Sequence, residues 1–130
     1  MLLLKQLLRC APALVWMGII AYWSSQSDLP IDQSSSPKLL HQLSHVGAYG
    51  VLALLLLLAT GTEPAGLLVA FAVAALYGLG DEIHQSFTPN RSPSLRDWAV
   101  DVCSAALAVA AVRPVWAWLP RTGRRRLSLR

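Results

Sequence analysis

The side chains with the most capacity for chemistry lie in one segment of this chain, between two apolar stretches. Residues 81–101, DEIHQSFTPNRSPSLRDWAVD, contain four carboxylates, a histidine, a glutamine and two arginines. Together these groups can bind a charged headgroup or move protons. An ionisable side chain at the centre of a membrane helix costs about 2.5–3.5 kcal/mol, so such residues mark a site by default. We therefore expect the function of the chain to lie here.

Two pairs of polar residues share the end of the preceding apolar stretch. Glu82 and Gln85 are i, i+3, and so are Asp81 and His84. Each pair lies on one face of a helix, and the two faces are about 100° apart. Both faces cannot point at lipid, and we expect Glu82 and Gln85 to face the interior of a helix bundle. The carboxylate of Glu82 is expected to pair with one of the two arginines that follow.

Two further acids begin the last apolar stretch. Asp97 and Asp101 are i, i+4 and share one helical face. That face continues in the small residues Ser104, Ala105 and Ala108, which suit close packing of helices. Asp101 is the most deeply placed acid, and a role as a solvated turn residue does not explain it.

Histidines and a tyrosine follow the same spacing on an earlier helix. His41, His45 and Tyr49 are i, i+4 and i+8, with His45 and Tyr49 expected on the bundle side and His41 at the interface. They either line a site or join helices by hydrogen bonds. The three histidines with an acid would suffice for zinc, but the spacing H-E-x-x-H is absent. The sequence therefore predicts no metal site and no cofactor.

Turn signals delimit the helices. Residues 38–60 read as one helix, and Pro64 is well placed in the first turn of the next. Ser94 and Asp97 have the spacing of a capping box, so the last helix is expected to begin near Ser94. Asn90 is a candidate for a positive φ. Cys10 and Cys103 are expected at different depths, too far apart for a disulfide.

Composition indicates a membrane protein. Of 130 residues, 55% are hydrophobic and 14% charged, and a chain of this length cannot bury four uniformly apolar helices in water. The predicted fold is all-α, a single domain over residues 1–130 with four transmembrane helices. The expected spans cover about 7–23, 43–60, 64–82 and 98–119, and a basic tail follows at 120–130.

Lysine and arginine set the expected orientation. Lys5 and Arg9 lie at the N-terminal end of the first span, and most other basic residues follow the last one. By the positive-inside rule both termini are cytoplasmic. The net charge of +4 is then mostly an orientation signal or a contact for anionic lipid, and we expect no nucleic-acid partner. The expected location is the cytoplasmic (inner) membrane, with several passes, and the bilayer is the first partner.

Several short motifs in this order resemble the VanZ-like family. They are His45-x-x-x-Tyr49, Asp81-Glu82-x-x-Gln85, Pro89-x-Arg91, Ser94 and Asp97, within a resemblance that covers roughly residues 15–112. It implies a small four-span membrane protein of the cell envelope. The founding member of the family is linked to resistance to the glycopeptide antibiotic teicoplanin. The chain departs from the family pattern at Asn90 (often Gly), Asp101 (often Asn) and Ser104 (often Gly).

The first functional hypothesis is binding. We expect an outward-facing polar pocket for an envelope ligand, such as a lipid-linked cell-wall precursor or a glycopeptide. Arg91 would hold a phosphate or carboxylate group through its bidentate guanidinium. The expected pocket residues are His45, Tyr49, Glu82, Gln85, Arg91, Asp97 and Asp101.

Two other hypotheses stay open. A hydrolase or transferase acting on a lipid-linked substrate would use Glu82, Asp97 or Asp101 as general base with His45, although no nucleophile elbow or phosphate loop is present. Alternatively, the polar residues only fix helix packing. The sequence assigns no catalytic residue and no oligomeric state.

Overall fold

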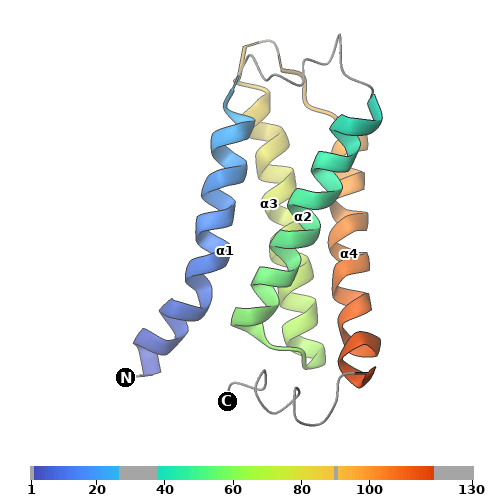
Figure 1. Ribbon diagram of the computed structural model, residues 1–130. Helices are drawn as coiled ribbons and strands as arrows, with labels where there is room; N and C mark the ends of the chain where they lie inside the picture. Colours follow the sequence, from blue (N-terminus) through green and yellow to red (C-terminus); the bar gives the residue numbers. More distant parts are fainter. Residues whose placement is uncertain (1, 27–37, 90, 119–130) are drawn as a thin grey trace.

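The computed structural model describes residues 2–26, 38–89 and 91–118 and contains four helices (Figure 1). They are α1 (Leu2–Ser24), α2 (Lys38–Thr60), α3 (Pro64–Gln85) and α4 (Leu95–Trp118). No strand occurs in the described part of the chain. The all-α prediction is confirmed.

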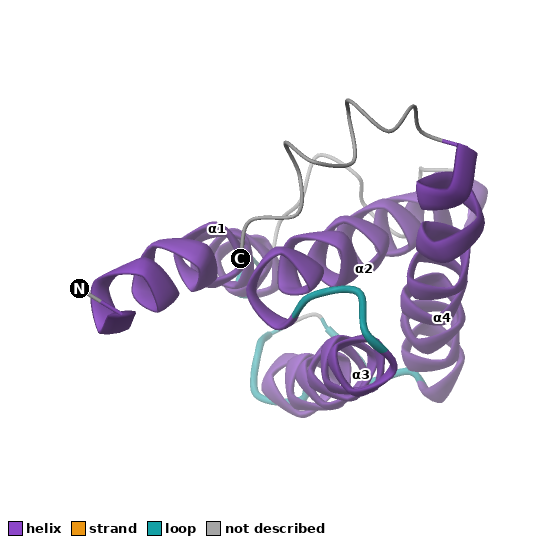
Figure 2. Cartoon of the chain, turned by 90° about the horizontal axis from the view of Figure 1, so that it is seen from below, coloured by secondary structure: helices purple, strands orange, loops and turns teal. Residues whose placement is uncertain are grey.

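The four helices form a bundle in which α2, α3 and α4 pack on one another, whereas α1 packs mainly along α2. α1 and α4 lie on opposite sides of α2 (Figure 2). The N-terminal end of α1 leans away from the bundle (Figure 1), on the N-terminal side of Pro12. A proline inside a helix removes one backbone hydrogen bond and bends the axis. The starts of α2 and α4 and the end of α3 meet at the opposite end of the bundle.

The turn signals of the sequence lie where they were expected. α2 begins at Lys38, and Pro64 occupies the first turn of α3 after an extended Glu63. Ser94 precedes α4, and the Asp97 N–H donates to Ser94 Oγ at 3.2 Å. The candidate positive φ at Asn90 lies outside the described residues. The two cysteines are free thiols.

Alanines fill much of the core on α3 and α4, and many leucines lie on the outer surface of the bundle. Ala70, Ala74 and Ala105 are fully buried, whereas Leu68 and Leu107 are largely exposed. This distribution is typical of membrane helices, which gain from close packing and have no need to hide leucine from lipid. Among the described residues, three segments are long and apolar enough to cross a membrane: Leu4–Ser24, Leu39–Thr60 and Pro64–Gln85.

Three aromatic side chains join neighbouring helices through backbone carbonyls. The donors are an indole on α1, a phenol on α3 and an indole on α4. The bonds run from Trp16 Nε1 to the Ala48 carbonyl (2.9 Å), from Tyr77 Oη to the Met17 carbonyl (2.6 Å) and from Trp98 Nε1 to the Ala75 carbonyl (3.0 Å). Each bond satisfies a donor that would otherwise be costly away from water.

Candidate functional site

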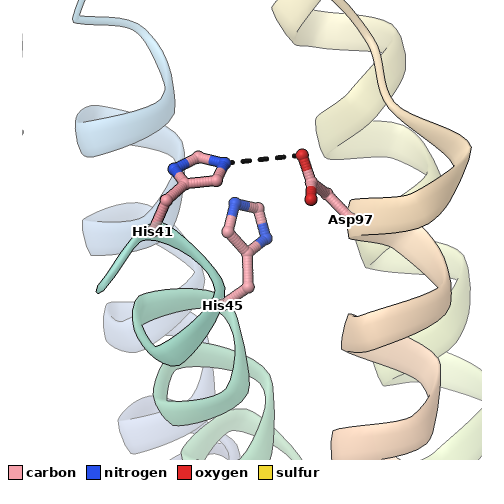
Figure 3. Close-up of side chains that lie close together, drawn as sticks. All are labelled: His41, His45 and Asp97. Carbon is pink, nitrogen blue, oxygen red and sulfur yellow. Dashed lines mark hydrogen bonds and ion pairs between the residues drawn. The ribbon is translucent and has the colours of Figure 1, made fainter. Parts of the chain in front are cut away.

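Two histidine–aspartate pairs join α2 to α4. His45 Nδ1 and Asp101 Oδ1 are 2.9 Å apart, and His41 Nε2 and Asp97 Oδ2 are 3.4 Å apart. Figure 3 shows the His45 ring beneath the His41–Asp97 pair. Asp101 is almost fully buried, whereas His41 and Asp97 are partly exposed. The polar site therefore has a deep pair and a shallower pair.

The pairs follow from the direction of the helices. α2 and α4 both begin at the same end of the bundle, so they run parallel (Figure 1). Parallel helices keep a constant offset, and both pairs join residues 56 apart in the sequence. Two i, i+4 pairs on two parallel helices therefore meet residue by residue. The small residues on this face of α4 let α2 and α4 pack closely. Ser104 Oγ, for example, donates to the Val46 carbonyl of α2 at 2.6 Å.

Glu82 joins the end of α3 to the start of α4. The Ser94 N–H donates to Glu82 Oε2 at 2.6 Å. Here the carboxylate lies at the N-terminus of α4, where the helix dipole favours negative charge. The expected ion pair between Glu82 and an arginine does not occur in the described part of the chain, because a backbone N–H is the partner instead.

The two arginines after Glu82 bind other groups. Arg91 Nε donates to the Gln26 carbonyl at 3.3 Å. Arg96 Nε and Nη2 each lie 3.0 Å from one end of the Gln42 side-chain amide, and they donate to it when the amide is oriented with its oxygen towards the guanidinium. Neither arginine forms an ion pair with an acid among the described residues. Arg91 therefore keeps its positive charge at the edge of the site.

Gln85 and Asp81 contribute a hydrogen-bonded pair to the site from α3. Gln85 Nε2 donates to Asp81 Oδ2 at 3.0 Å, and both side chains are buried together with Glu82. His84 is exposed and lies 2.9 Å from Ser25 Oγ. The prediction that Glu82 and Gln85 face the bundle is therefore confirmed. Asp81, which was expected on the other face, lies inside as well.

Tyr49 lies one helical turn after His45 on α2 and packs against its ring. Its side chain is 1% exposed, and its ring stacks on His45 with centroids 6.3 Å apart. A Cβ on Gly78 would lie 3.2 Å from Tyr49 Cε1, so glycine leaves room for this ring. Within the described residues, four buried side-chain atoms of the site and its cavity have no hydrogen-bond partner: Ser24 Oγ, Tyr49 Oη, Glu82 Oε1 and Asp101 Oδ2. Buried polar atoms are normally satisfied by protein, water or ligand.

A cavity of about 450 Å³ adjoins the polar residues. Its apolar wall comes from α1 and α2 and includes Trp16, Ile20 and Val51. Its polar lining includes His41, His45, Tyr49, Asp81, Gln85 and Arg91. This size lies within the usual range for small-molecule sites, about 300–1,000 Å³.

The structure thus brings most of the predicted site residues together. Four of them line the cavity: His45, Tyr49, Gln85 and Arg91. Asp97 and Asp101 bond to the lining residues His41 and His45, whereas Glu82 bonds to the Ser94 N–H outside the lining. Sequence reasoning left out two residues of the site, His41 and Asp81. No signal in the sequence pairs His41 with Asp97, because helix packing sets the register of α2 against α4.

Comparison with known proteins agrees with this architecture. The family model described as VanZ/LLP1 matches residues 10–117, most of the chain. The chain belongs to the VanZ/LLP1 family. No curated protein and no solved structure matches. The polar motifs of this VanZ/LLP1 member lie at the meeting point of α2, α3 and α4, and its long apolar helices are those of a membrane protein.

Proposed function

We propose that this VanZ/LLP1 protein binds a lipid-linked headgroup of the cell envelope in the cavity bounded by α1, α2 and the end of α3. The observation that carries the proposal is the lining of this cavity. An apolar wall with two tryptophans passes into a polar end with one acid, Asp81, two histidines and Arg91. An amphipathic molecule matches both parts.

The proposed topology is a single domain with four spans in the cytoplasmic membrane. α4 (Leu95–Trp118) is as long as the other helices and packs against α2 and α3. Because basic residues lie near the start of α1 and follow α4 in the sequence, the positive-inside rule supports cytoplasmic termini. In this orientation the polar end of the cavity faces outward, towards envelope precursors.

The charges at the polar end support an anionic group with hydroxyl or amine substituents. Arg91 borders the cavity without a described acid as ion-pair partner, and guanidinium binds phosphate or carboxylate through paired hydrogen bonds. Asp81 and the unpartnered Tyr49 Oη offer acceptors or donors to neutral polar groups. A lipid-linked sugar phosphate combines these features.

Native mass spectrometry of the protein purified in mild detergent tests the proposal. We expect a co-purifying lipid of defined mass on the wild type. Arg91→Ala should lower its retention about 10-fold or more, because a charge-assisted hydrogen bond contributes about 1.5–3 kcal/mol. Arg96→Ala is the matched control, because Arg96 bonds to Gln42 and does not line the cavity.

A folded wild type without bound lipid, or equal loss from both arginine variants, contradicts the proposal. Retention of an added glycopeptide with the same dependence on Arg91 would redirect it to that ligand. Circular dichroism and size-exclusion chromatography establish that each variant is folded.

A second candidate is a hydrolase or transferase acting on the same lipid-linked substrate. One observation favours it. The Asp101 carboxylate is hydrogen-bonded to the His45 ring, and in many enzymes such a carboxylate orients a histidine that acts as a base. Glu82 and Asp97 lie beside this pair and would supply further proton transfer. The isosteric change Asp101→Asn separates the candidates. If the protein is an enzyme, the variant keeps the bound lipid but no longer gives the cleaved or transferred mass that the wild type gives. If it is a binding protein, neither the wild type nor the variant gives such a mass.

A further inference from the structure

His41, His45 and Asp97 come together at the end of the bundle where α2 and α4 begin (Figure 3). One ligand atom from each of these residues lies within 4.8 Å of the other two. We propose that these three side chains bind a divalent transition-metal ion of the zinc class. The sequence predicted no metal site, and lipid binding does not require one.

The residue types match the ion. Two imidazoles and one carboxylate leave a fourth coordination position open, as in many catalytic zinc sites. The 3.4 Å between His41 Nε2 and Asp97 Oδ2 is long for a charge-assisted hydrogen bond, which is about 2.7–2.9 Å. It is close to the roughly 3.3 Å between two ligand atoms that each lie about 2.0–2.1 Å from a tetrahedral zinc ion.

Asp101 orients His45 for this role. His45 Nδ1 is 2.9 Å from Asp101 Oδ1, and Asp101 is 1% exposed, so the ring is held by a rigid partner. With Nδ1 as the donor, Nε2 keeps its lone pair. Figure 3 shows this second ring nitrogen pointing towards the His41–Asp97 pair. Metal-binding histidines almost always donate their other N–H to such a carboxylate or carbonyl.

The backbone supports the same arrangement. His41 and His45 are i, i+4 on α2, the spacing at which zinc-binding helices present two histidines on one face. The third ligand, Asp97, belongs to α4 and lies four residues before the orienting Asp101. The sequence spacing alone could not reveal the site, because its ligands come from two helices.

A neighbouring trio, His45, Glu82 and Asp101, also has ligand atoms within 4.8 Å of one another. It is the weaker candidate, because Glu82 already accepts the Ser94 N–H and Asp101 already holds His45. The side chains of His41 and Asp97 are 21% and 19% exposed, so an ion can reach them. His41 and His45 also line the cavity, so the open position of the ion would be available to a ligand there.

Cobalt titration of the purified full-length protein tests the site. The protein in mild detergent is first stripped with a chelator and then titrated with Co²⁺, whose visible absorption reports four-coordinate binding. Competition with Zn²⁺ and elemental analysis give the affinity and the stoichiometry. We expect one ion per chain in the wild type and loss of binding in Asp97→Asn and His41→Gln. Asp101→Asn should weaken binding about 10–100-fold, as removal of an outer carboxylate does.

His84→Gln is the matched control, because His84 is exposed and bonds to Ser25 away from the trio. It should bind cobalt like the wild type. The proposal is overturned if the folded wild type binds no stoichiometric ion, or if both Asp97→Asn and His41→Gln bind normally. Loss confined to Glu82→Gln would assign the ion to the deeper trio and also overturn it. Native mass spectrometry of the same samples reports lipid separately, so failure of one proposal is distinguishable from failure of the other.

Discussion

At the scale of single residues, the two histidine–aspartate pairs have the same spacing and different burial. The side chains of His45 and Asp101 are 12% and 1% exposed, whereas those of His41 and Asp97 are 21% and 19% exposed. An exposed pair contributes about 0.2–1 kcal/mol. Removal of one partner from a buried pair costs about 3–5 kcal/mol, because the other charge stays buried without compensation. The deep pair should therefore dominate stability.

His45→Ala should accordingly lower the free energy of unfolding by about 3–5 kcal/mol. His41→Ala, the matched variant one turn earlier, should lower it by no more than about 1 kcal/mol. Chemical denaturation in detergent with a chelator present measures both values without any contribution from bound metal. Equal losses would show that burial does not separate the two pairs.

The double variant His45→Leu/Asp101→Leu provides a further check on this explanation. It removes both partners, so no charge remains buried alone. We expect its free energy of unfolding to be higher than that of His45→Ala. A lower value would mean that the imidazole stabilises the bundle by packing on Tyr49, on which it stacks, rather than by its charge.

The residues of the site were predictable where one helix defines their position. Spacing within α2 predicted the inward position of His45 and Tyr49, and spacing within α3 predicted that of Glu82 and Gln85. Spacing did not predict their partners, because the register between helices is set by packing. Thus Glu82 bonds to the Ser94 N–H and not to an arginine, and His41 has a role that only the parallel offset of α2 and α4 reveals.

At the scale of elements, helix existence was readable from apolar runs, and the starts of α2 and α4 from turn signals, but the apolar runs alone did not give the helix ends. The first span was expected from residue 7, whereas α1 begins at Leu2. The last span was expected from residue 98, whereas α4 begins at Leu95. In both places the helix extends through polar residues beyond the apolar run. Lys5 and Gln6 are good helix formers, so the hydrophobic boundary does not end the helix.

The α2–α3 turn requires glycine at two positions. Gly61 has φ +84°, a conformation that side chains with a Cβ rarely adopt. At Gly66 a Cβ would overlap the Thr60 carbonyl oxygen and lie 2.5 Å from that of Gly61. Backbone atoms cannot rotate away as a side chain does. The start of α3 is therefore fixed against the end of α2.

Gly66→Ala should destabilise the protein by about 1–3 kcal/mol, the usual cost of overpacking. Gly80→Ala on the same helix is the control, since a Cβ there meets nothing within 4 Å. It should be neutral or raise stability by up to about 1 kcal/mol, because alanine favours helix. Thermal unfolding in detergent compares the two variants. A stable Gly66→Ala variant would mean that the turn can shift without loss.

At the scale of the whole molecule, the two ends of the bundle differ in character. One end carries the histidines, acids and Arg91, and the other carries the short α2–α3 turn (Figure 1). The proposed orientation puts the polar end outside the cell and the turn inside. This assignment rests on the distribution of basic residues at the chain ends.

Cysteine labelling of intact cells tests this orientation. In a Cys10→Ser/Cys103→Ser background, Ser92→Cys in the α3–α4 turn should react with a membrane-impermeant maleimide. Glu63→Cys in the α2–α3 turn should react only after the cells are permeabilised. Both native residues are exposed, so accessibility within the protein is comparable. The reverse pattern would invert the topology and place the cavity towards the cytoplasm.

The aromatic bonds between helices have a consequence for how the family can diverge. Each of the three bonds has a side chain as donor and a backbone carbonyl as acceptor, at Ala48, Met17 and Ala75. Every residue type carries that carbonyl, so the acceptor positions can change identity as long as the new side chain fits. The donors Trp16, Tyr77 and Trp98 have no such freedom. A substitution at Ala48, Met17 or Ala75 can therefore keep the bond, whereas a substitution that removes a donor ring loses it.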